Sequence, residues 1–273
     1  SKVRRSCWLR QEQAMPDAPL QGVGVLVTRP RPQATELVEA IESRGGSAYC
    51  FPVLEIVPFD ELDIRNSLSR LGKPDIVIFV SRNAVEHGIA YTNGGAIAVI
   101  GPATAAAVAA AGRVVDIQPG DGYDSEHLLA EDRLQDVAGK CIRIIRGRSG
   151  RELLADELKR RGATVEYLSV YERRQPALDT DTRANLERQW RQGHINVVTA
   201  MSVESFINLV ELLPAWCVSQ LESTPLVTPA GRVLKEVLNR FPASRPILDS
   251  GPGADEMVEA IIALQSTDSG IAP

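Results

Sequence analysis

Arginine, hydroxyl-bearing and glycine residues recur where short apolar strands of the sequence end and helical segments begin. The strand ends carry Thr28 and Arg29; Ser81, Arg82 and Asn83; Pro102 and Thr104; Arg146, Gly147, Arg148 and Arg151; Thr199 and Ser202; and Thr228. Arginine side chains and hydroxyl groups bind carboxylates and phosphates by hydrogen bonding. The free backbone N–H groups and the dipole of a following helix favour the same anions. The pattern therefore predicts an anion site at the carboxyl ends of the strands.

Each of these residues also has an ordinary structural use. A serine or threonine before a helix commonly caps its N-terminus, and a single surface arginine is usually solvated. The functional interpretation therefore depends on the recurrence of the pattern at five or six equivalent strand ends, and on no residue alone.

The elements that must position these residues alternate between strand and helix along the chain. Strands are predicted at 24–28, 47–57, 75–81, 96–101, 140–146, 164–172, 195–200, 225–228 and 245–250. Helical patterns of roughly 10–15 residues separate most of these strands. The alternation indicates an α/β fold with parallel sheets and right-handed crossovers.

An internal repeat divides the chain into two related α/β halves. Residues 25–56 align without a gap on residues 142–173, and the alignment pairs Gly45 with Gly162. After each copy the chain has a strand with a hydroxyl-bearing turn and then a strand with a proline turn. We expect two similar domains, with a site between them lined by equivalent loops.

Composition narrows the classes of function. The chain has 30 lysine and arginine residues against 35 aspartate and glutamate, and this net charge of −5 argues against nucleic acid as a partner. Its four scattered cysteines form no CxxC pair and are typical of reduced thiols in a cytoplasmic protein. No run is apolar enough for a membrane span, so no membrane partner is expected, and residues 1–14 resemble an extension rather than a secretory signal. Neither a metal motif, a dinucleotide fingerprint nor a P-loop is readable.

Five segments together resemble the uroporphyrinogen-III synthase family. They are TRPRPQATELVEAIESRGG (28–46), FVSRNAV (79–85), IGPATAAAVAAAG (100–112), RIIRGRSGRELLADELKRRGATVEYLSVYERR (143–174) and ILDSGPGADEMVEAI (247–261). Much of each segment is helix-cap and core pattern, but their order and spacing are specific. The resemblance covers about residues 22–264.

The resemblance implies a bilobed fold in which one α/β domain is inserted into the other. The implied parts are an extension at 1–21, domain 1 at 22–53 plus 175–265, domain 2 at 59–168, a two-stranded β connector at 54–58 and 169–174, and a tail at 266–273. Two connecting strands with few contacts between the lobes would permit large domain motion.

It also implies the reaction, a dehydrative cyclisation of the linear tetrapyrrole hydroxymethylbilane to uroporphyrinogen III. Ring D is inverted through a spirocyclic intermediate, and no cofactor is required. Because unassisted closure would give the uninverted isomer, the protein must impose a shape on a flexible substrate. The expected partners are this polycarboxylate substrate and, transiently, the preceding enzyme of the pathway, and the protein is expected to be a monomer.

Tyr171 matches a tyrosine of the family motif, and the resemblance makes it the candidate catalytic residue. Phenols are protonated at neutral pH and can donate to a leaving hydroxyl group. The alternative is a half-buried strand tyrosine with a structural hydrogen bond. The candidate substrate-binding residues are Thr28, Arg29, Ser81, Asn83, Gly101, Thr104, Tyr123, Ser125, Arg146, Gly147, Thr199, Ser202 and Thr228.

The chain departs from the family pattern at two turns. Ala230 and Gly231 follow Thr228 where the family usually has a hydroxyl pair, and Ala200 follows Thr199. These changes favour carboxylate binding by loop backbone, so most single substitutions should have modest effects. A non-catalytic two-lobed binding or sensing module for an acidic ligand would use the same fold. A sugar- or nucleotide-processing α/β enzyme is disfavoured by the absent motifs.

Overall fold

A computed structural model of the chain describes residues 18–268, except residues 151, 250 and 252. The predicted extension at 1–14 lies outside the described residues. The chain divides into two compact units. Unit 1 contains the described residues up to Leu54 and those from Gln175 onward, and unit 2 is Glu55–Arg174.

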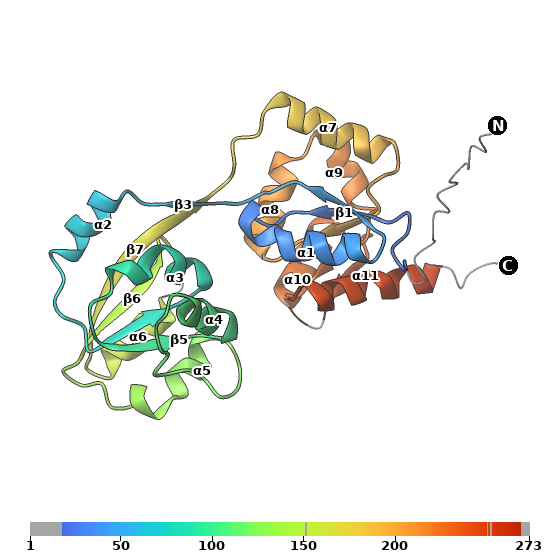
Figure 1. The fold of residues 1–273 in the computed structure, drawn as a ribbon. Coiled ribbons are helices and arrows are strands. Elements are labelled where there is room, and N and C mark those ends of the chain that lie inside the picture. Colours follow the sequence, from blue (N-terminus) through green and yellow to red (C-terminus); the bar gives the residue numbers. More distant parts are fainter. Residues whose placement is uncertain (1–17, 151, 250, 252, 269–273) are drawn as a thin grey trace, which may run out of the picture. The chain divides into compact units, whose positions relative to one another are not determined.

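Unit 1 is a five-stranded parallel sheet with helices on both faces (Figure 1). In spatial order its strands are β10 (Pro246–Leu248), β9 (Leu226–Thr228), β8 (Val197–Thr199), β1 (Gly24–Val27) and β2 (Ser47–Cys50). Its helices are α1 (Arg31–Ser43), α7 (Thr180–Arg191), α8 (Val203–Leu212), α9 (Ala215–Leu221), α10 (Gly231–Arg240) and α11 (Ala254–Asp268).

The core of unit 1 lies on both faces of this sheet, because successive strand residues point to opposite sides. Val25 and Val27 pack in a cluster with residues of α1 and α11, whereas Leu26 packs with α7, α8, α9 and α10. Leu20 is fully buried in the first cluster, so the fold begins before residue 22 and the predicted extension at 1–21 is too long. At the other end α11 continues to Asp268, because no proline or glycine interrupts it, and so enters the predicted tail.

Unit 2 has the same kind of architecture. In spatial order its strands are β3 (Glu55–Pro58), β7 (Thr164–Arg174), β6 (Cys141–Gly147), β4 (Ile76–Phe79) and β5 (Ala96–Val99). Its helices are α2 (Glu61–Leu68), α3 (Arg82–Gly88), α4 (Pro102–Ala110), α5 (Ser125–Ala130) and α6 (Leu153–Arg160), with short 3₁₀ turns η1 (Ile89–Tyr91) and η2 (Asp132–Leu134). One apolar cluster packs under α5 and α6, and the other under α2, α3 and α4.

Four strands of unit 2 are parallel, and β3 pairs antiparallel with the second half of β7, from Glu55 opposite Arg174 to Pro58 opposite Tyr171. The single strand predicted at 47–57 is wrong. It is divided between β2 and β3, which lie in different sheets, and Pro52, which has no N–H to donate to a ladder, lies between them. The predicted α/β class with mainly parallel sheets is confirmed.

The two sheets share one spatial order, as the internal repeat requires. β2-β1-β8-β9-β10 in unit 1 corresponds to β7-β6-β4-β5 in unit 2, where a bridge from Ala98 to Ile117 takes the place of β10. Gly45 and Gly162, paired by the repeat, both have a positive φ, of 84° and 88°, and end α1 and α6. Among the parallel strands of unit 2 the chain begins at β4 rather than at β6, so the parallel parts of the two units are circular permutations of each other.

Candidate functional site

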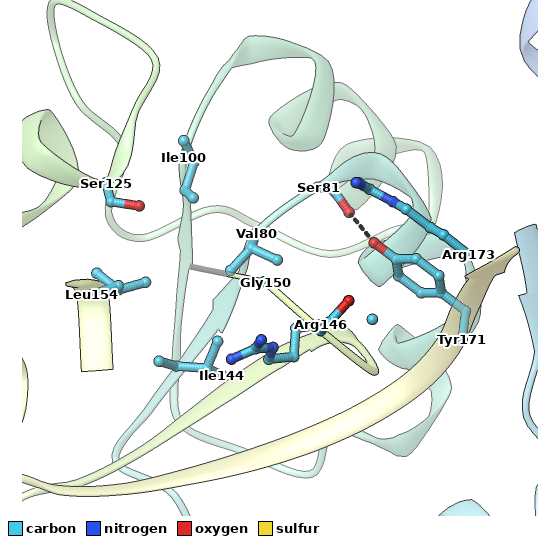
Figure 2. A pocket seen from close by; sticks show the side chains of 12 residues that line it. Val80, Ser81, Ile100, Ser125, Ile144, Arg146, Gly150, Leu154, Tyr171 and Arg173 are labelled. Carbon is cyan, nitrogen blue, oxygen red and sulfur yellow. Dashed lines mark hydrogen bonds between the residues drawn. The ribbon is translucent and has the colours of Figure 1, made fainter. Parts of the chain in front are cut away.

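A pocket of about 300 Å³ lies in unit 2 at the carboxyl edge of its parallel strands (Figure 2). This volume is at the low end of small-molecule sites, so it suits one ring-sized part of a larger ligand. The apolar wall is formed by Val80, Ile100, Ile144 and Leu154, and the polar side chains are Ser81, Ser125, Arg146, Ser149, Tyr171 and Arg173. Open α/β sheets bind ligands at this edge.

Tyr171 and Ser81 form the first polar pair of the pocket. The two hydroxyl oxygens are 3.2 Å apart, and either can donate (Figure 2). Ser81 is also the N-cap of α3, since its Oγ accepts a hydrogen bond from the N–H of Ala84 at 3.2 Å. Tyr171 is only 2% exposed, and its hydroxyl is fixed by Ser81, which the backbone of α3 holds in place.

A register shift in the sheet turns Tyr171 toward Ser81. In regular alternation Tyr171 would point to the face opposite Val170. The pairing of β6 with β7 skips Val170, however, because Arg146 lies opposite Ser169 and Gly147 opposite Tyr171. Val170 and Tyr171 consequently pack in the same apolar cluster, beneath α3. Such bulges commonly redirect a side chain beside a functional site.

Gly147 is required by the ring of Tyr171. A Cβ atom at this position would lie 2.9 Å from Cε2 and 3.0 Å from Cζ of the tyrosine, closer than ordinary contact. Any larger residue at the end of β6 would therefore force the phenol ring to shift.

Arg146, Glu152 and Tyr167 form a second polar group. The Arg146 guanidinium is directed toward Ile144 and away from Tyr171 (Figure 2). Its Nη1 donates to Glu152 Oε1 at 2.9 Å, and its Cζ lies 4.6 Å from the centre of the Tyr167 ring. The Tyr167 hydroxyl donates to Glu152 Oε2. Hydrogen bonds from Tyr167 and Arg146 lower the pKa of the Glu152 carboxyl, while burial and the bond to Glu152 raise the pKa of Tyr167 to about 12.

The structure brings five predicted residues of unit 2 into this pocket, namely Ser81, Ser125, Arg146, Gly147 and Tyr171. The remaining four do not line it. Asn83 in α3 and Thr104 in α4 are buried, and exposed Tyr123 packs against Gly101, where a Cβ atom would lie 3.3 Å from the tyrosine Cβ.

The sequence interpretation missed Glu152 and Tyr167. A signal for Tyr167 was present, because alternation along adjacent strands places Arg146 and Tyr167 on the same face once the two strands are paired. Glu152 carried no such signal, since it precedes α6 outside any strand, where no periodicity sets the direction of a side chain.

The predicted hydroxyls of unit 1 lie at the carboxyl edge of its sheet but bond to backbone. Thr28 Oγ1 donates to the carbonyl of Thr199 at 2.6 Å, and Thr199 Oγ1 donates to that of Leu26 at 3.1 Å. Thr228 Oγ1 accepts from the N–H of Ala230 at 3.2 Å. All three threonines are buried, so their hydroxyl groups fix strand ends.

The other two predicted residues of unit 1 also have structural contacts. Ser202 is the N-cap of α8, since its Oγ accepts from the N–H of Ser205 at 3.1 Å. Nη2 of Arg29 lies 3.4 Å from Met257 Sδ.

Within the residues that the structure describes, no three histidine, cysteine, aspartate or glutamate side chains gather in a way that could hold a metal ion. No helix in this part of the chain has the length and apolar character needed to cross a membrane.

Comparison with known proteins gives a consistent result. A family model described as Uroporphyrinogen-III synthase HemD matches residues 35–259. The uroporphyrinogen-III synthase of Escherichia coli K12 is 32% identical over 203 residues, which cover 71% of this chain and 81% of the relative. The Salmonella typhimurium LT2 protein of the same name matches with the same identity and coverage.

Two solved structures share the fold. The uroporphyrinogen-III synthetase of Helicobacter pylori 26695 has a TM-score of 0.61 at 11% identity. A mutant uroporphyrinogen III synthase from the extremely thermophilic bacterium Thermus thermophilus has a TM-score of 0.56 at 17% identity. Both comparisons cover 89% of this chain and 99% of the other.

Proposed function

The chain belongs to the uroporphyrinogen-III synthase family, and we propose that its reaction, the closure of hydroxymethylbilane to uroporphyrinogen III, uses the pocket of unit 2. The observation that supports this site is the hydroxyl pair of Tyr171 and Ser81, held in a pocket that also contains buried Arg146. The pair supplies a proton donor, and the arginine supplies a cation for a substrate that carries carboxylate groups.

Tyr171 is the proposed proton donor for the first step. Its phenol protonates the hydroxymethyl oxygen on ring A, the C–O bond breaks, and water leaves. Ring A is then an azafulvene electrophile. The substituted carbon of ring D attacks it to give the spirocyclic intermediate, which fragments and recloses with ring D inverted. The proton lost from ring D on rearomatisation replaces the one that Tyr171 gave, so the step sequence releases one water and no other product.

Ser81 positions the Tyr171 hydroxyl in this scheme. Its Oγ takes one hydrogen bond from the backbone of α3 and shares a second with the phenol. A donor fixed in this way can contribute about 10²- to 10⁴-fold to a rate. Arg146 in turn binds a carboxylate arm of the substrate, which fixes a ring relative to the donor and helps to select the inverted product.

The corresponding edge of unit 1 is a second proposed place for substrate carboxylates, bound through backbone. Its threonine hydroxyls already have backbone partners, but α8 and α10 begin there, and the first N–H groups of a helix have no partner within the helix. This arrangement predicts that substitutions of single hydroxyl groups in unit 1 will change turnover only modestly.

The test of the site is Tyr171→Phe beside Ser81→Ala, in an assay that generates hydroxymethylbilane in place and resolves the product isomers. We expect Tyr171→Phe to lower kcat about 100-fold, because the proton donor is removed while the ring is kept. Ser81→Ala should have a smaller effect, because the phenol remains. A Tyr171→Phe variant that is less stable but turns over at the wild-type rate would assign the tyrosine a structural role only.

A further inference from the structure

Arg146 is a buried cation that is held in place, whereas its counter-ion, Glu152, is free to move. The arginine is 7% exposed, and its guanidinium lies against Gly150, where a Cβ atom would be 3.0 Å from Nη2. The side chain of Glu152, in contrast, is 55% exposed and is anchored in the loop before α6. A carboxylate with that exposure can rotate into water at little cost, whereas Arg146 always needs a negative partner.

Only one carboxylate oxygen of Glu152 accepts a hydrogen bond from Arg146. Its Oε1 accepts from Nη1 at 2.9 Å, but its Oε2 accepts from the Tyr167 hydroxyl. The pairing of Glu152 with Arg146 is therefore monodentate. A carboxylate without a second partner can take two parallel hydrogen bonds from a guanidinium, which is the stronger geometry.

We propose that Glu152 is a displaceable internal carboxylate that keeps Arg146 paired in the free protein and leaves when a carboxylate arm of the substrate binds. The inference rests on the proposed function for the identity of that ligand. Tyr167 sets the resting position, because its hydroxyl holds the second oxygen of Glu152 while its ring supports the guanidinium at 4.6 Å. The strength of the Glu152–Arg146 pairing thus sets how tightly a substrate carboxylate must bind Arg146 to displace Glu152.

The departure of Glu152 leaves a cationic site. Lys159 Nζ lies 6.0 Å from the centre of the same Tyr167 ring on which Arg146 rests. Two cations then lie near one ring without the Glu152 carboxylate, which favours a ligand with neighbouring acidic arms. In a protein with a net charge of −5, such local concentration of positive charge is required to hold a polyanion.

Glu152→Gln tests the exchange, because glutamine keeps the size of the side chain and removes its charge. We expect the KM for hydroxymethylbilane to fall by about two- to fivefold, the range that loss of a partly exposed ion pair produces, with the change in KM rather than in kcat. Tyr167→Phe keeps the ring but leaves both oxygens of Glu152 available to Arg146, so the KM of this variant should rise instead. Asp156→Asn is the matched control, since it makes the same charge change at an exposed position of α6 and should leave the KM unchanged.

A direct binding measurement separates this proposal from the proposed function. Calorimetric titration with oxidised uroporphyrin III, which carries the same acidic arms as the product, should show tighter binding to Glu152→Gln than to the wild type. If the KM of Glu152→Gln is unchanged or raised, or if its affinity for uroporphyrin III does not increase, Glu152 only orients Arg146. Either result would overturn the proposal that substrate displaces Glu152. A wild-type protein that forms no isomer III would refute the proposed function, while the titration would still decide the exchange.

Discussion

Replacing Gly147 with alanine would push a methyl group into the ring of Tyr171. The added Cβ atom would lie 2.9 Å from Cε2 and 3.0 Å from Cζ, whereas ordinary contact begins near 3.4 Å. The ring must therefore shift by about 0.5 Å. The φ angle of Gly147 is not in the left-handed region, so an alanine there strains no backbone. The effect of the substitution comes from the contact with the ring.

This shift acts on the hydroxyl group that the proposed mechanism uses. The Tyr171–Ser81 distance of 3.2 Å is already near the long end for two hydroxyl groups, and a further shift of about 0.5 Å would break the hydrogen bond. We expect kcat to fall about 10- to 100-fold, since misplacement of a catalytic group by an ångström can cost about 10². The methyl group should also lower the free energy of unfolding by about 1–3 kcal/mol, because the ring is buried and cannot yield freely.

The assay measures isomer III formed per minute by the folded fraction, alongside a urea titration of stability. Gly120→Ala is the control. Gly120 is in the same unit, and a Cβ atom there would have no other atom within 4 Å. A Gly147→Ala protein with lowered stability and wild-type kcat would refute the reasoning, since the ring would have moved without consequence for the reaction.

Three further predictions concern stability and reactivity. Burial opposes ionisation of Glu166, but hydrogen bonds from Gly72 and Arg143 lower the pKa of its carboxyl overall. Its stabilisation is therefore complete above the unfolded pKa and lost as pH falls through the lower folded value, so the melting temperatures of wild type and Glu166→Gln should converge below about pH 4. Burial raises the pKa of the Cys217 thiol to about 11, so iodoacetamide at about pH 8 should label it only after denaturation, as mass spectrometry would show. Thr199→Val should lower the free energy of unfolding in urea by about 1 kcal/mol with turnover changed less than about fivefold, and a loss of activity of about 1000-fold would contradict its structural role.

Much of the fold is readable from the sequence because local and long-range signals agree. The buried β-branched runs of parallel strands are unmistakable, as in Ile76–Phe79, and each of the nine predicted strand segments overlaps an observed strand. The gapless repeat also predicts equivalent positions, since Gly45 and Gly162 both end their helices with a positive φ.

The candidate site is less readable because it depends on register and on loop paths. The side to which Tyr171 points follows from one skipped residue in the β6–β7 ladder, which no periodicity shows. Hydroxyl groups at strand ends look alike in sequence, yet Ser81 reaches a pocket while Thr28 and Thr199 bond to neighbouring strands. Only the three-dimensional pairing separates these roles.

The most direct test of the account is the isomer composition of the product. Hydroxymethylbilane is generated in place by a coupled reaction, the products are oxidised, and the uroporphyrin isomers are resolved by chromatography. We predict predominantly isomer III, formed in proportion to the amount of this protein and strongly reduced by Tyr171→Phe. Isomer I alone, at the rate seen without the protein, would contradict the account, because the chain would then keep the fold of the family without its chemistry.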